Sequence, residues 1–550
     1  MILLAIVTLI PVYIASRAYI YRRDRSLSDD RILPRHVALI PPYFSLGVFL
    51  PNYLMWYKLN IGWLQKDTMY KDAPLNITIF QPLLFGRRLI YCANLTYFRH
   101  VMSSRAPYTK AGKDVFRVIG GNIFSANGEA WRRHRRIVAP TFNYHTYKNV
   151  WETTTNVYKE MIKEEGWLVA EGGKEVNIIE NTHKVAMFLI SIIGFGIPVS
   201  WSTPPFDEYG NRSVHSLFLY VTANIFTRGR VPDWLFKLGI KRLDDIDKEY
   251  KTFEKYMSKL IAQREIELKG ILDTEGSNSS TLEDSLKDIL GRLVYARLAE
   301  GKLSLTDDEI MGNCFLFAFA GHETTANSLA ATLAELALNP DKQEWLYKQI
   351  VDAIGNRPPT FDDYDNLDCV LASFCEAMRL YPAAFVLTRE SEKDEIVSIP
   401  SDKSRGKSDI LIKKNDVIAL DFVGMSYDAE TYPDPYSFKP ERWLSNEGNE
   451  KKTSITKDMD AGEISGGSSM NSLNGFIGFS IGPRTCIGHK FAKVEAVALL
   501  TNLIREWRVE PVKEPGETNA EWRKRYLSSP KFKVTMTFGD VPLRFFRREN

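Results

Sequence analysis

Phe479-Ser480-Ile481-Gly482-Pro483-Arg484-Thr485-Cys486-Ile487-Gly488 is the stretch that decides how this sequence folds. Glycines stand on both sides of Cys486, so the backbone there can pass close beneath a flat ligand. An apolar helical run, residues 490–505, follows, and the amides at the start of a helix stabilise a thiolate. A lone cysteine is usually a small core residue. This setting instead predicts a thiolate ligand, with Arg484 placed to pair with a carboxylate.

A second motif, Ala320-Gly321-His322-Glu323-Thr324-Thr325, lies inside a predicted long helix over 306–339. Asn313, Phe317, Ala320 and Thr324 recur at three- and four-residue spacing, so they share one helix face. Gly321 weakens the helix, and the Thr324 hydroxyl can bond a backbone carbonyl. We expect a local kink with room for water and a ligand against this face.

Two further motifs bear on the same site. Glu376 and Arg379 are three residues apart in an otherwise apolar run, so they share a helix face that we expect to be buried. In the basic run 131–136, Trp131 and Arg135 are four residues apart and point to one side, which argues against a plain solvated face.

The cysteine segment resembles that of the cytochrome P-450 superfamily at Phe479, Gly482, Arg484, Cys486 and Gly488. With the other three motifs in order, the resemblance runs from about residue 40 to the end. It implies a haem-thiolate fold in which Cys486 is the axial ligand of the iron of haem b, and a thiolate favours cleavage of dioxygen. It also implies that Glu323 and Thr324 deliver protons during dioxygen activation.

The resemblance assigns roles to several other residues. The structural triad that supports the haem side of the core would be Glu376, Arg379 and Arg442 of the Pro-Glu-Arg segment. The residues expected to bind the haem or its carboxylates are Trp131, Arg135, Arg389, Arg484 and Phe479. The remaining arginines of 131–136, with Lys490 and Lys493, would form a positive docking surface for an acidic electron donor.

The predicted reaction is insertion of one oxygen atom of O2 into a lipophilic substrate, an oxidoreductase reaction with paired donors, in specialised metabolite biosynthesis. Electrons would come from NADPH through a separate cytochrome P-450 reductase, with cytochrome b5 as a possible second donor, since no dinucleotide-binding segment is visible. The expected substrate wall comprises the stretch 105–124 with Phe124, then Phe317 and Ala320 on the long helix, and Ala384 and Phe385.

Two alternatives remain open. One is a haem-thiolate isomerase or dehydratase, which rearranges a peroxide without a reductase and needs no proton relay. The other is a haem-based sensor that holds iron without turnover. The motifs also depart from the family pattern at Met425-Ser426-Tyr427-Asp428, where many relatives have a His-Arg-Asp-like run, and at Trp443, where Phe is more usual.

The N-terminal segment, residues 2–21, is apolar and long enough to span a bilayer. Basic residues follow it, which places the rest of the chain in the cytoplasm. We expect a transmembrane anchor over 1–21, a basic, proline-containing linker over 22–42 and a catalytic domain over 43–550, held at the endoplasmic reticulum membrane. A cleavable signal peptide is the alternative for 1–21. The apolar run 43–56 is either a membrane-dipping surface or part of the core.

Composition fits a folded enzyme. The 550 residues are 44% hydrophobic, with 71 basic and 68 acidic residues and a net charge of +3, so nothing suggests nucleic-acid binding. Five scattered cysteines argue against a disulfide framework. The fold class is mainly α with small β-sheets. Helices are predicted at 247–269, 282–297, 306–339, 341–354 and 369–381, and strands at 77–80, 417–422 and 531–538.

Overall fold

The computed structural model describes residues 11–13, 15, 16, 19, 33–38, 60–73, 75–82, 86–111, 116–275, 282, 286–301, 304–401, 406–444, 476–532 and 535–549. The chain divides into two compact units. The first contains Met1–Gly112, Arg379–Ser437 and Gly475–Thr485, and the second contains Lys113–Met378, Phe438–Asn474 and Cys486–Asn550.

The expected membrane anchor at 1–21, the linker at 22–42 and the run 43–56 lie largely outside the described residues. Within the part of the chain that the structure describes, none of the helices combines the length and apolarity that a bilayer crossing requires.

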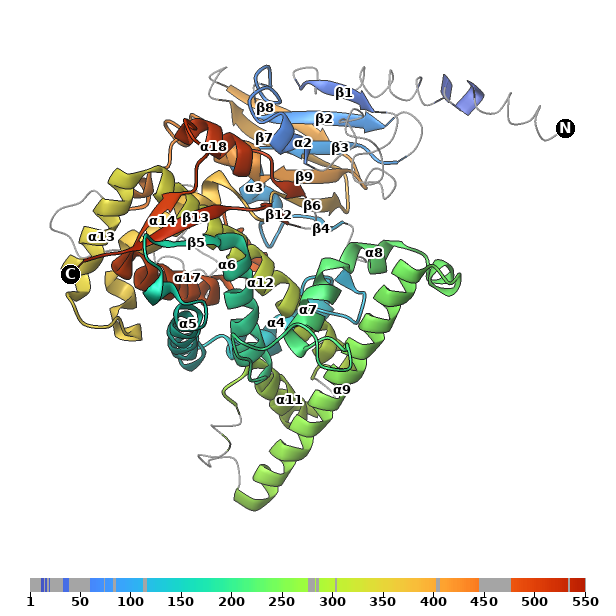
Figure 1. Cartoon of the computed structure of the whole chain (residues 1–550). Helices are drawn as coiled ribbons and strands as arrows, with labels where there is room; N and C mark the ends of the chain where they lie inside the picture. The colour runs from blue at the N-terminus through green and yellow to red at the C-terminus, as the bar shows by residue number, and fades with distance from the viewer. Residues whose placement is uncertain are drawn as a thin grey trace. The chain divides into compact units, whose positions relative to one another are not determined.

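The first unit contains a six-stranded sheet in the order β1-β2-β3-β9-β6-β4 (Figure 1). Its strands are β1 (Arg35–Ala38), β2 (Ile77–Pro82), β3 (Leu89–Cys92), β4 (Tyr108–Lys110), β6 (Val386–Ser391) and β9 (Val417–Asp421). β3 pairs with β9 in parallel, with Ile90 opposite Ile418. A two-stranded sheet, β7 (Glu395–Ser401) and β8 (Gly406–Ile412), and helix α3 (Leu95–Val101) also belong to this unit.

The central strands are apolar without alternation because both faces of the sheet are buried. Ile90, Cys92, Ile418 and Leu420 belong to one hydrophobic cluster, whereas their neighbours Leu89, Tyr91, Val417 and Ala419 belong to another. Successive side chains of a strand point to opposite faces, so each strand contributes to both clusters.

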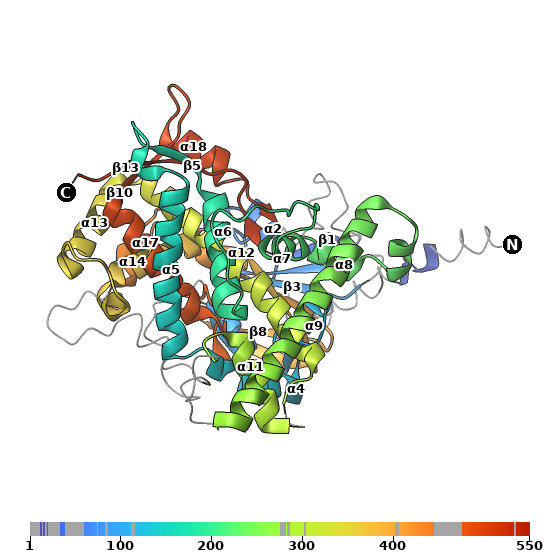
Figure 2. The same ribbon diagram turned by 60° about the horizontal axis from the view of Figure 1, so that its bottom comes forward.

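Helices dominate the second unit (Figure 2). In chain order they are α4 (Gly128–Val138), α5 (Tyr144–Glu164), α6 (Ile178–Leu189), α7 (Val214–Ala223), α8 (Ile225–Arg230), α9 (Lys241–Glu275), α11 (Ile289–Glu300), α12 (Asp307–Leu338), α13 (Pro340–Ile354), α14 (Asp368–Leu380, whose last two residues belong to the first unit), α17 (His489–Glu506) and α18 (Asn519–Tyr526). A three-stranded antiparallel sheet has the order β10 (Trp507–Pro511), β13 (Pro542–Arg547) and β5 (Lys174–Asn177).

Helix α12 is the longest buried element of the second unit. A capping box fixes its start: Thr306 Oγ1 accepts from Glu309 N at 3.2 Å, and Glu309 Oε2 accepts from Thr306 N at 3.1 Å. Helices α6, α9, α13 and α17 and strand β10 all contact it. The prediction of a long helix over 306–339 is confirmed within one residue at each end.

The helices predicted at 341–354 and 369–381 are also confirmed within one residue at each end, as α13 and α14, whereas other predicted elements differ more. The helix expected to start at residue 282 starts at Ile289, because the Asp288 carboxylate caps it by accepting from Gly291 N at 2.7 Å. The predicted strand over 531–538 consists of two short paired strands, β11 (Lys531–Phe532) and β12 (Met536–Thr537). The mainly helical class with small sheets is confirmed.

Candidate functional site

The cysteine segment begins in the first unit with a sharp change of backbone direction. Ser480 has φ of 62° and Gly482 has φ of 73°, both in the left-handed region. A Cβ on Gly482 would lie 2.3 Å from the carbonyl oxygen of Met102. Glycine is therefore required at this position both for its conformation and for the close approach of Met102.

Cys486 follows in the second unit, three residues before α17 begins at His489. It is the only one of the five cysteines, all of which are described, whose side chain is exposed. The surrounding protein nevertheless raises the pKa of its thiol by burial, while the Gly488 N–H and the charges of Arg135 and Lys493 lower it. The thiol is thus accessible and lies beside groups that favour its anionic form.

Helix α12 opens to solvent at one place. From Ile310 to Leu338 every residue is buried except Ala320, Gly321, Glu323 and Thr324. We call these four residues the window. A Cβ on Gly321 would lie 2.6 Å from the side chain of Ile190, which starts a π-helical turn at Ile190–Gly194. The motif selected from the sequence therefore coincides with the only accessible part of this stretch.

Two side chains of the motif have defined hydrogen bonds. Thr324 Oγ1 donates to Ala320 O at 2.7 Å, so the lone pairs of the hydroxyl remain to accept from an O–H group at the window. His322 is buried, and its Nδ1 donates to Ala318 O at 2.6 Å. Burial lowers the pKa of His322 to about 4, so this imidazole is neutral at pH 7. Glu323 and Thr324, and not His322, are the polar groups at the window.

Glu376 is a fully buried carboxylate that accepts three hydrogen bonds. Arg442 Nε donates to Oε1 at 3.0 Å, Lys439 N donates to Oε1 at 3.0 Å, and Trp443 Nε1 donates to Oε2 at 2.9 Å. The structure thus brings Glu376 and Arg442 together. Sequence reasoning missed the role of Trp443, whose indole N–H supplies a bond that phenylalanine cannot make.

Arg379, the third residue of the expected triad, is buried in the first unit. Its guanidinium donates to the backbone carbonyls of Ser426, Pro435 and Ser437, at 2.8, 2.7 and 3.2 Å. This side chain therefore ties the end of α14 to the loop that follows β9.

Three cationic side chains gather in the first unit. Arg389 is 5% exposed and donates to Thr388 O, and no carboxylate among the described residues pairs with it. Burial lowers its pKa to about 10. Burial, then the charges of Arg389 and Arg484, lower the pKa of Lys110 well below its usual value. Lys110 was not predicted, because a three-residue strand carries no sequence signal. The cluster is suited to an anionic ligand group.

Helix α4 carries the basic run 131–136. Trp131 and Arg135 are half-buried, and Arg132 and Arg136 are exposed. The expected positive docking surface is smaller than predicted. Arg133 is paired with Glu309 of α12, and Lys493 is only 1% exposed, so neither contributes to a free surface. The sequence did not indicate that Lys493, a basic residue of the helix α17, points inward.

The expected substrate wall is placed as follows. Phe317 is buried, with its ring 6.0 Å from that of Phe142, and Ala320 lies in the window. Phe124 is half-buried, with its ring 4.6 Å from that of Phe116. In the first unit, Ala384 is half-buried, and Phe385 is buried with its carbonyl accepting from Phe422 N.

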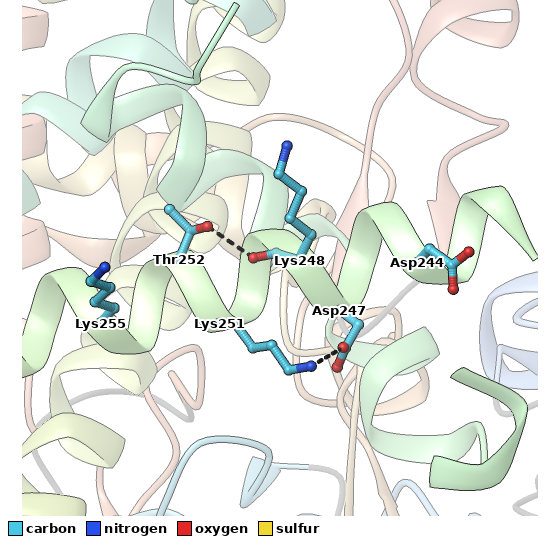
Figure 3. A pocket seen from close by; sticks show the side chains of 6 residues that line it. All are labelled: Asp244, Asp247, Lys248, Lys251, Thr252 and Lys255. Atoms are coloured by element: carbon cyan, nitrogen blue, oxygen red, sulfur yellow. Dashed lines mark hydrogen bonds and ion pairs between the residues drawn. The ribbon is translucent and has the colours of Figure 1, made fainter. Parts of the chain in front are cut away.

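A shallow hollow on α9 differs from the predicted site because its lining is charged and polar. Its lining, shown in Figure 3, consists of Asp244, Asp247, Lys248, Lys251, Thr252 and Lys255. Lys251 pairs with Asp247 at 2.6 Å, and Thr252 bonds to Lys248 O at 2.9 Å. All six residues come from the exposed side of the single helix α9, so the hollow lacks the apolar enclosure of a ligand site.

The residues of the predicted site fit a haem. The second unit offers an accessible thiol at the start of a helix and a helix window of small and polar residues. The first unit offers a buried arginine that lacks a carboxylate partner among the described residues. Of the residues expected to hold the cofactor, Cys486, Trp131 and Arg135 belong to the second unit, and Arg389 and Arg484, with Lys110 beside them, belong to the first.

Comparisons with known proteins agree with this chemistry. A family model described as Cytochrome P-450 matches residues 51–536. The chain is 29% identical to cytochrome P-450 monooxygenase 124 of Postia placenta, over 92% of this chain and 90% of that protein. It is 25% identical to cytochrome P-450 monooxygenase prx9 of Penicillium rubens, over 86% and 82%. The crystal structure of a cytochrome P-450 superposes with a TM-score of 0.65 at 20% identity, covering 94% of this chain and 99% of that one, which shows a shared fold.

Replacing Glu376 by alanine is expected to lower the free energy of unfolding by about 3–5 kcal/mol, because it leaves the Arg442 guanidinium, the Trp443 indole and the Lys439 amide without their acceptor. Urea unfolding followed by circular dichroism measures the change. The control is Glu175→Ala, which removes an exposed ion pair with Arg544 and should cost under about 1 kcal/mol. Equal losses in the two variants would show that the Glu376 carboxylate has no special structural role.

Proposed function

Because the chain belongs to the cytochrome P-450 family and is a monooxygenase of that family, we propose that its Cys486 binds the iron of haem b and that the enzyme oxidises a lipophilic substrate. One atom of O2 enters the substrate, and the other leaves as water with two protons and two electrons. The observation that carries the proposal is the exposed thiol of Cys486, held between the Gly482 turn and the start of α17.

The bound haem supplies the binding and reductive cleavage of dioxygen. The chain's own residues set its surroundings. Burial raises the pKa of the Cys486 thiol, and the Gly488 N–H and the positive charges of Arg135 and Lys493 offset part of this cost of forming the thiolate. Arg389, a buried guanidinium that pairs with no carboxylate among the described residues, is proposed to bind a haem carboxylate. By resemblance the same role is proposed for Arg484 in the first unit and for Trp131 and Arg135 in the second.

Proton delivery is assigned to Thr324 and Glu323. The Thr324 hydroxyl donates to Ala320 O and so presents its lone pairs to a ligand at the window, where it can accept and pass on a proton. Glu323 is the one carboxylate of the window, and its backbone carbonyl accepts from Asn327 Nδ2 at 2.7 Å, which steadies this turn. Buried neighbours on all other parts of the helix limit access of bulk water.

Electrons are proposed to come from NADPH through a separate reductase, with cytochrome b5 as a second donor. Exposed Arg136 of α4 and half-exposed Lys490 of α17 place positive charge where an acidic partner could meet it, and exposed Arg132 beside them is ion-paired with Glu129. The substrate is proposed to be a lipophilic intermediate of specialised metabolism, since the wall residues Phe124, Phe317, Ala320, Ala384 and Phe385 are apolar. Changes in the haem spectrum across a lipophilic library identify its class.

Replacing Cys486 by serine is expected to abolish the red-shifted Soret band that a thiolate-ligated haem gives after reduction and carbon monoxide treatment, because an alcohol is a poor ligand for the iron. Absorption spectroscopy and haem content measure this. The control is Cys369→Ser, which changes a half-exposed thiol on α14 and should leave the spectrum intact. An unchanged spectrum in the Cys486 variant would refute the assignment.

Replacing Thr324 by alanine is expected to uncouple the enzyme: with a reductase, oxygen and NADPH are still consumed, while product per NADPH falls several-fold because proton delivery fails. The control is Thr332→Ala, which removes the same type of bond, to Ser328 O at 2.7 Å, at a fully buried position. Product formed without NADPH, and insensitive to the Thr324 change, would indicate the isomerase or dehydratase. The absence of NADPH consumption with any substrate would indicate the sensor.

We also propose that the enzyme works at a membrane of the endoplasmic reticulum. The segment after α8 exposes Trp234 by 61%, Leu238 by 58% and Ile240 by 46%, and Lys237 and Lys241 beside them are exposed as well. Apolar side chains flanked by lysines suit the interface of an anionic bilayer.

Vesicles containing brominated lipid are expected to quench part of the tryptophan emission of the full-length protein, and Trp234→Phe should remove much of the quenched fraction because this indole enters the bilayer. Fluorescence titration measures it. Trp522→Phe is the matched control, since Trp522 is fully buried. If both variants are quenched like the original protein, this segment does not contact lipid.

A further inference from the structure

The loop 116–126 lies directly against the first turns of α12. A Cβ on Gly312 would lie 2.5 Å from Gly121 O, and a Cβ on Gly120 would lie 2.1 Å from Asp308 O. The two backbones therefore touch without intervening side chains, and glycine is required at both positions. This close approach leaves backbone N–H and C=O groups of the loop facing α12, whose own carbonyls already accept hydrogen bonds within the helix. The loop groups therefore need side-chain partners.

Asn313 supplies these partners. Its side chain is fully buried, and Oδ1 accepts from the backbone N–H of Ile123 at 2.9 Å. This bond fixes the orientation of the amide, so Nδ2 makes the other two contacts. It donates to Glu309 O at 2.6 Å and to Nδ1 of His134 at 3.0 Å. One amide thus joins the loop 116–126, α4 and α12.

The bond to Asn313 also sets the state of His134. Because Nδ1 accepts, the proton of the neutral imidazole is on Nε2, which faces Glu309 Oε1 at 3.4 Å. Burial lowers the pKa of His134, in agreement with a neutral ring. Glu309 is the capping-box residue of α12 and pairs with Arg133 of the same helix as His134. The start of α12 and the body of α4 are therefore locked together.

The loop is rigid within itself. Asn122 is fully buried; its Nδ2 donates to Phe116 O at 2.6 Å, and its Oδ1 accepts from Ser125 N at 2.9 Å. The Phe116 ring lies 4.6 Å from that of Phe124 and 6.1 Å from that of Phe319 on α12. A shift of the loop at Ile123 would therefore move both aromatic rings together.

We propose that Asn313 is a positioning residue for substrate selection: its amide holds the loop 116–126 to α12 and α4 and so sets where Phe116 and Phe124 stand. This inference rests on the proposed function. Helix propensity does not explain the residue, since leucine is a better helix former than asparagine. What distinguishes this asparagine is that its amide bonds two groups outside the helix, the Ile123 N–H and His134 Nδ1.

The test uses the haem-loaded full chain and two variants. Asn313→Leu keeps the volume and removes all three bonds, whereas Asn313→Asp keeps the acceptor for Ile123 N. Hydrogen exchange followed by mass spectrometry should show about tenfold faster exchange in peptides covering 116–126 for the leucine variant, the effect of losing one hydrogen bond. The aspartate variant keeps the bond from Ile123 N but loses the two bonds that Nδ2 donates, so its exchange should lie between those of the original protein and the leucine variant.

A second measurement, the preference between two haem ligands, reports on the positions of the Phe116 and Phe124 rings. Imidazole and 4-phenylimidazole both bind haem iron, but only the phenyl group of the second reaches the walls. We expect the preference for 4-phenylimidazole over imidazole, from spectral titration, to fall about tenfold in Asn313→Leu and to fall less in Asn313→Asp. Asn502→Leu is the matched control, because Asn502 is buried in α17 and its amide donates to Ala498 O of its own helix.

Each result of these experiments supports or overturns the proposed role of Asn313. The inference is overturned if Asn313→Leu leaves exchange of the loop and the ligand preference unchanged, if Asn502→Leu reproduces both changes, or if Asn313→Asp behaves like Asn313→Leu. Should Asn313→Leu fail to fold, faster exchange of 116–126 in Asn313→Asp than in Asn502→Leu supports the inference, and exchange equal to that of the original protein overturns it. A failure of the original protein to bind either ligand would refute the haem proposal, while the exchange rates would still test the Asn313 contact.

Discussion

A helix of 32 residues that is buried along nearly its whole length needs cover on every side, and this constraint shapes the second unit. At 1.5 Å per residue α12 is about 48 Å long. Helices α6, α9, α13 and α17 and strand β10 share the task of covering it. Its fully buried alanines, among them Ala318, Ala326 and Ala330, leave space for close packing. The window at Ala320–Thr324 is where that cover stops, so the place for chemistry follows from packing.

Burial also forces α12 to satisfy its own polar side chains. Thr324, Ser328 and Thr332 each donate to the carbonyl four residues earlier, at 2.7, 2.9 and 2.7 Å. The same arrangement that removes the cost of burying Ser328 and Thr332 leaves Thr324, in the window, with free lone pairs. Two asparagines of α12 use their side-chain oxygens to bond backbone N–H groups of other segments. Asn313 bonds Ile123 N and Asn327 bonds Phe538 N, so the helix anchors distant segments without disrupting itself.

Periodicity predicted the helices well, because each buries one face or all faces over many turns. In the six-stranded sheet it found β2 and β9, predicted at 77–80 and 417–422, but missed β3 (Leu89–Cys92), which pairs with β9 across more than three hundred residues. Four apolar residues with both faces buried give no alternation and no local signal. At the site, the glycines around Cys486 and the polar motif in α12 were found from sequence. The inward direction of Lys493, the bond from Trp443 to Glu376 and the place of Lys110 depend on tertiary packing that spacing does not reveal.

Buried arginines in the first unit show how the chain handles charge. Arg88 is bonded to Asp416, and Arg379 donates to three backbone carbonyls. Arg389 is equally buried, yet among the described residues it has the Thr388 carbonyl and the sulfur of Met102 as neighbours, with Lys110 as a second positive charge. A buried cation beside another cation costs several kcal/mol unless an anion offsets it. An anionic group at Arg389, such as the proposed haem carboxylate, would offset this cost.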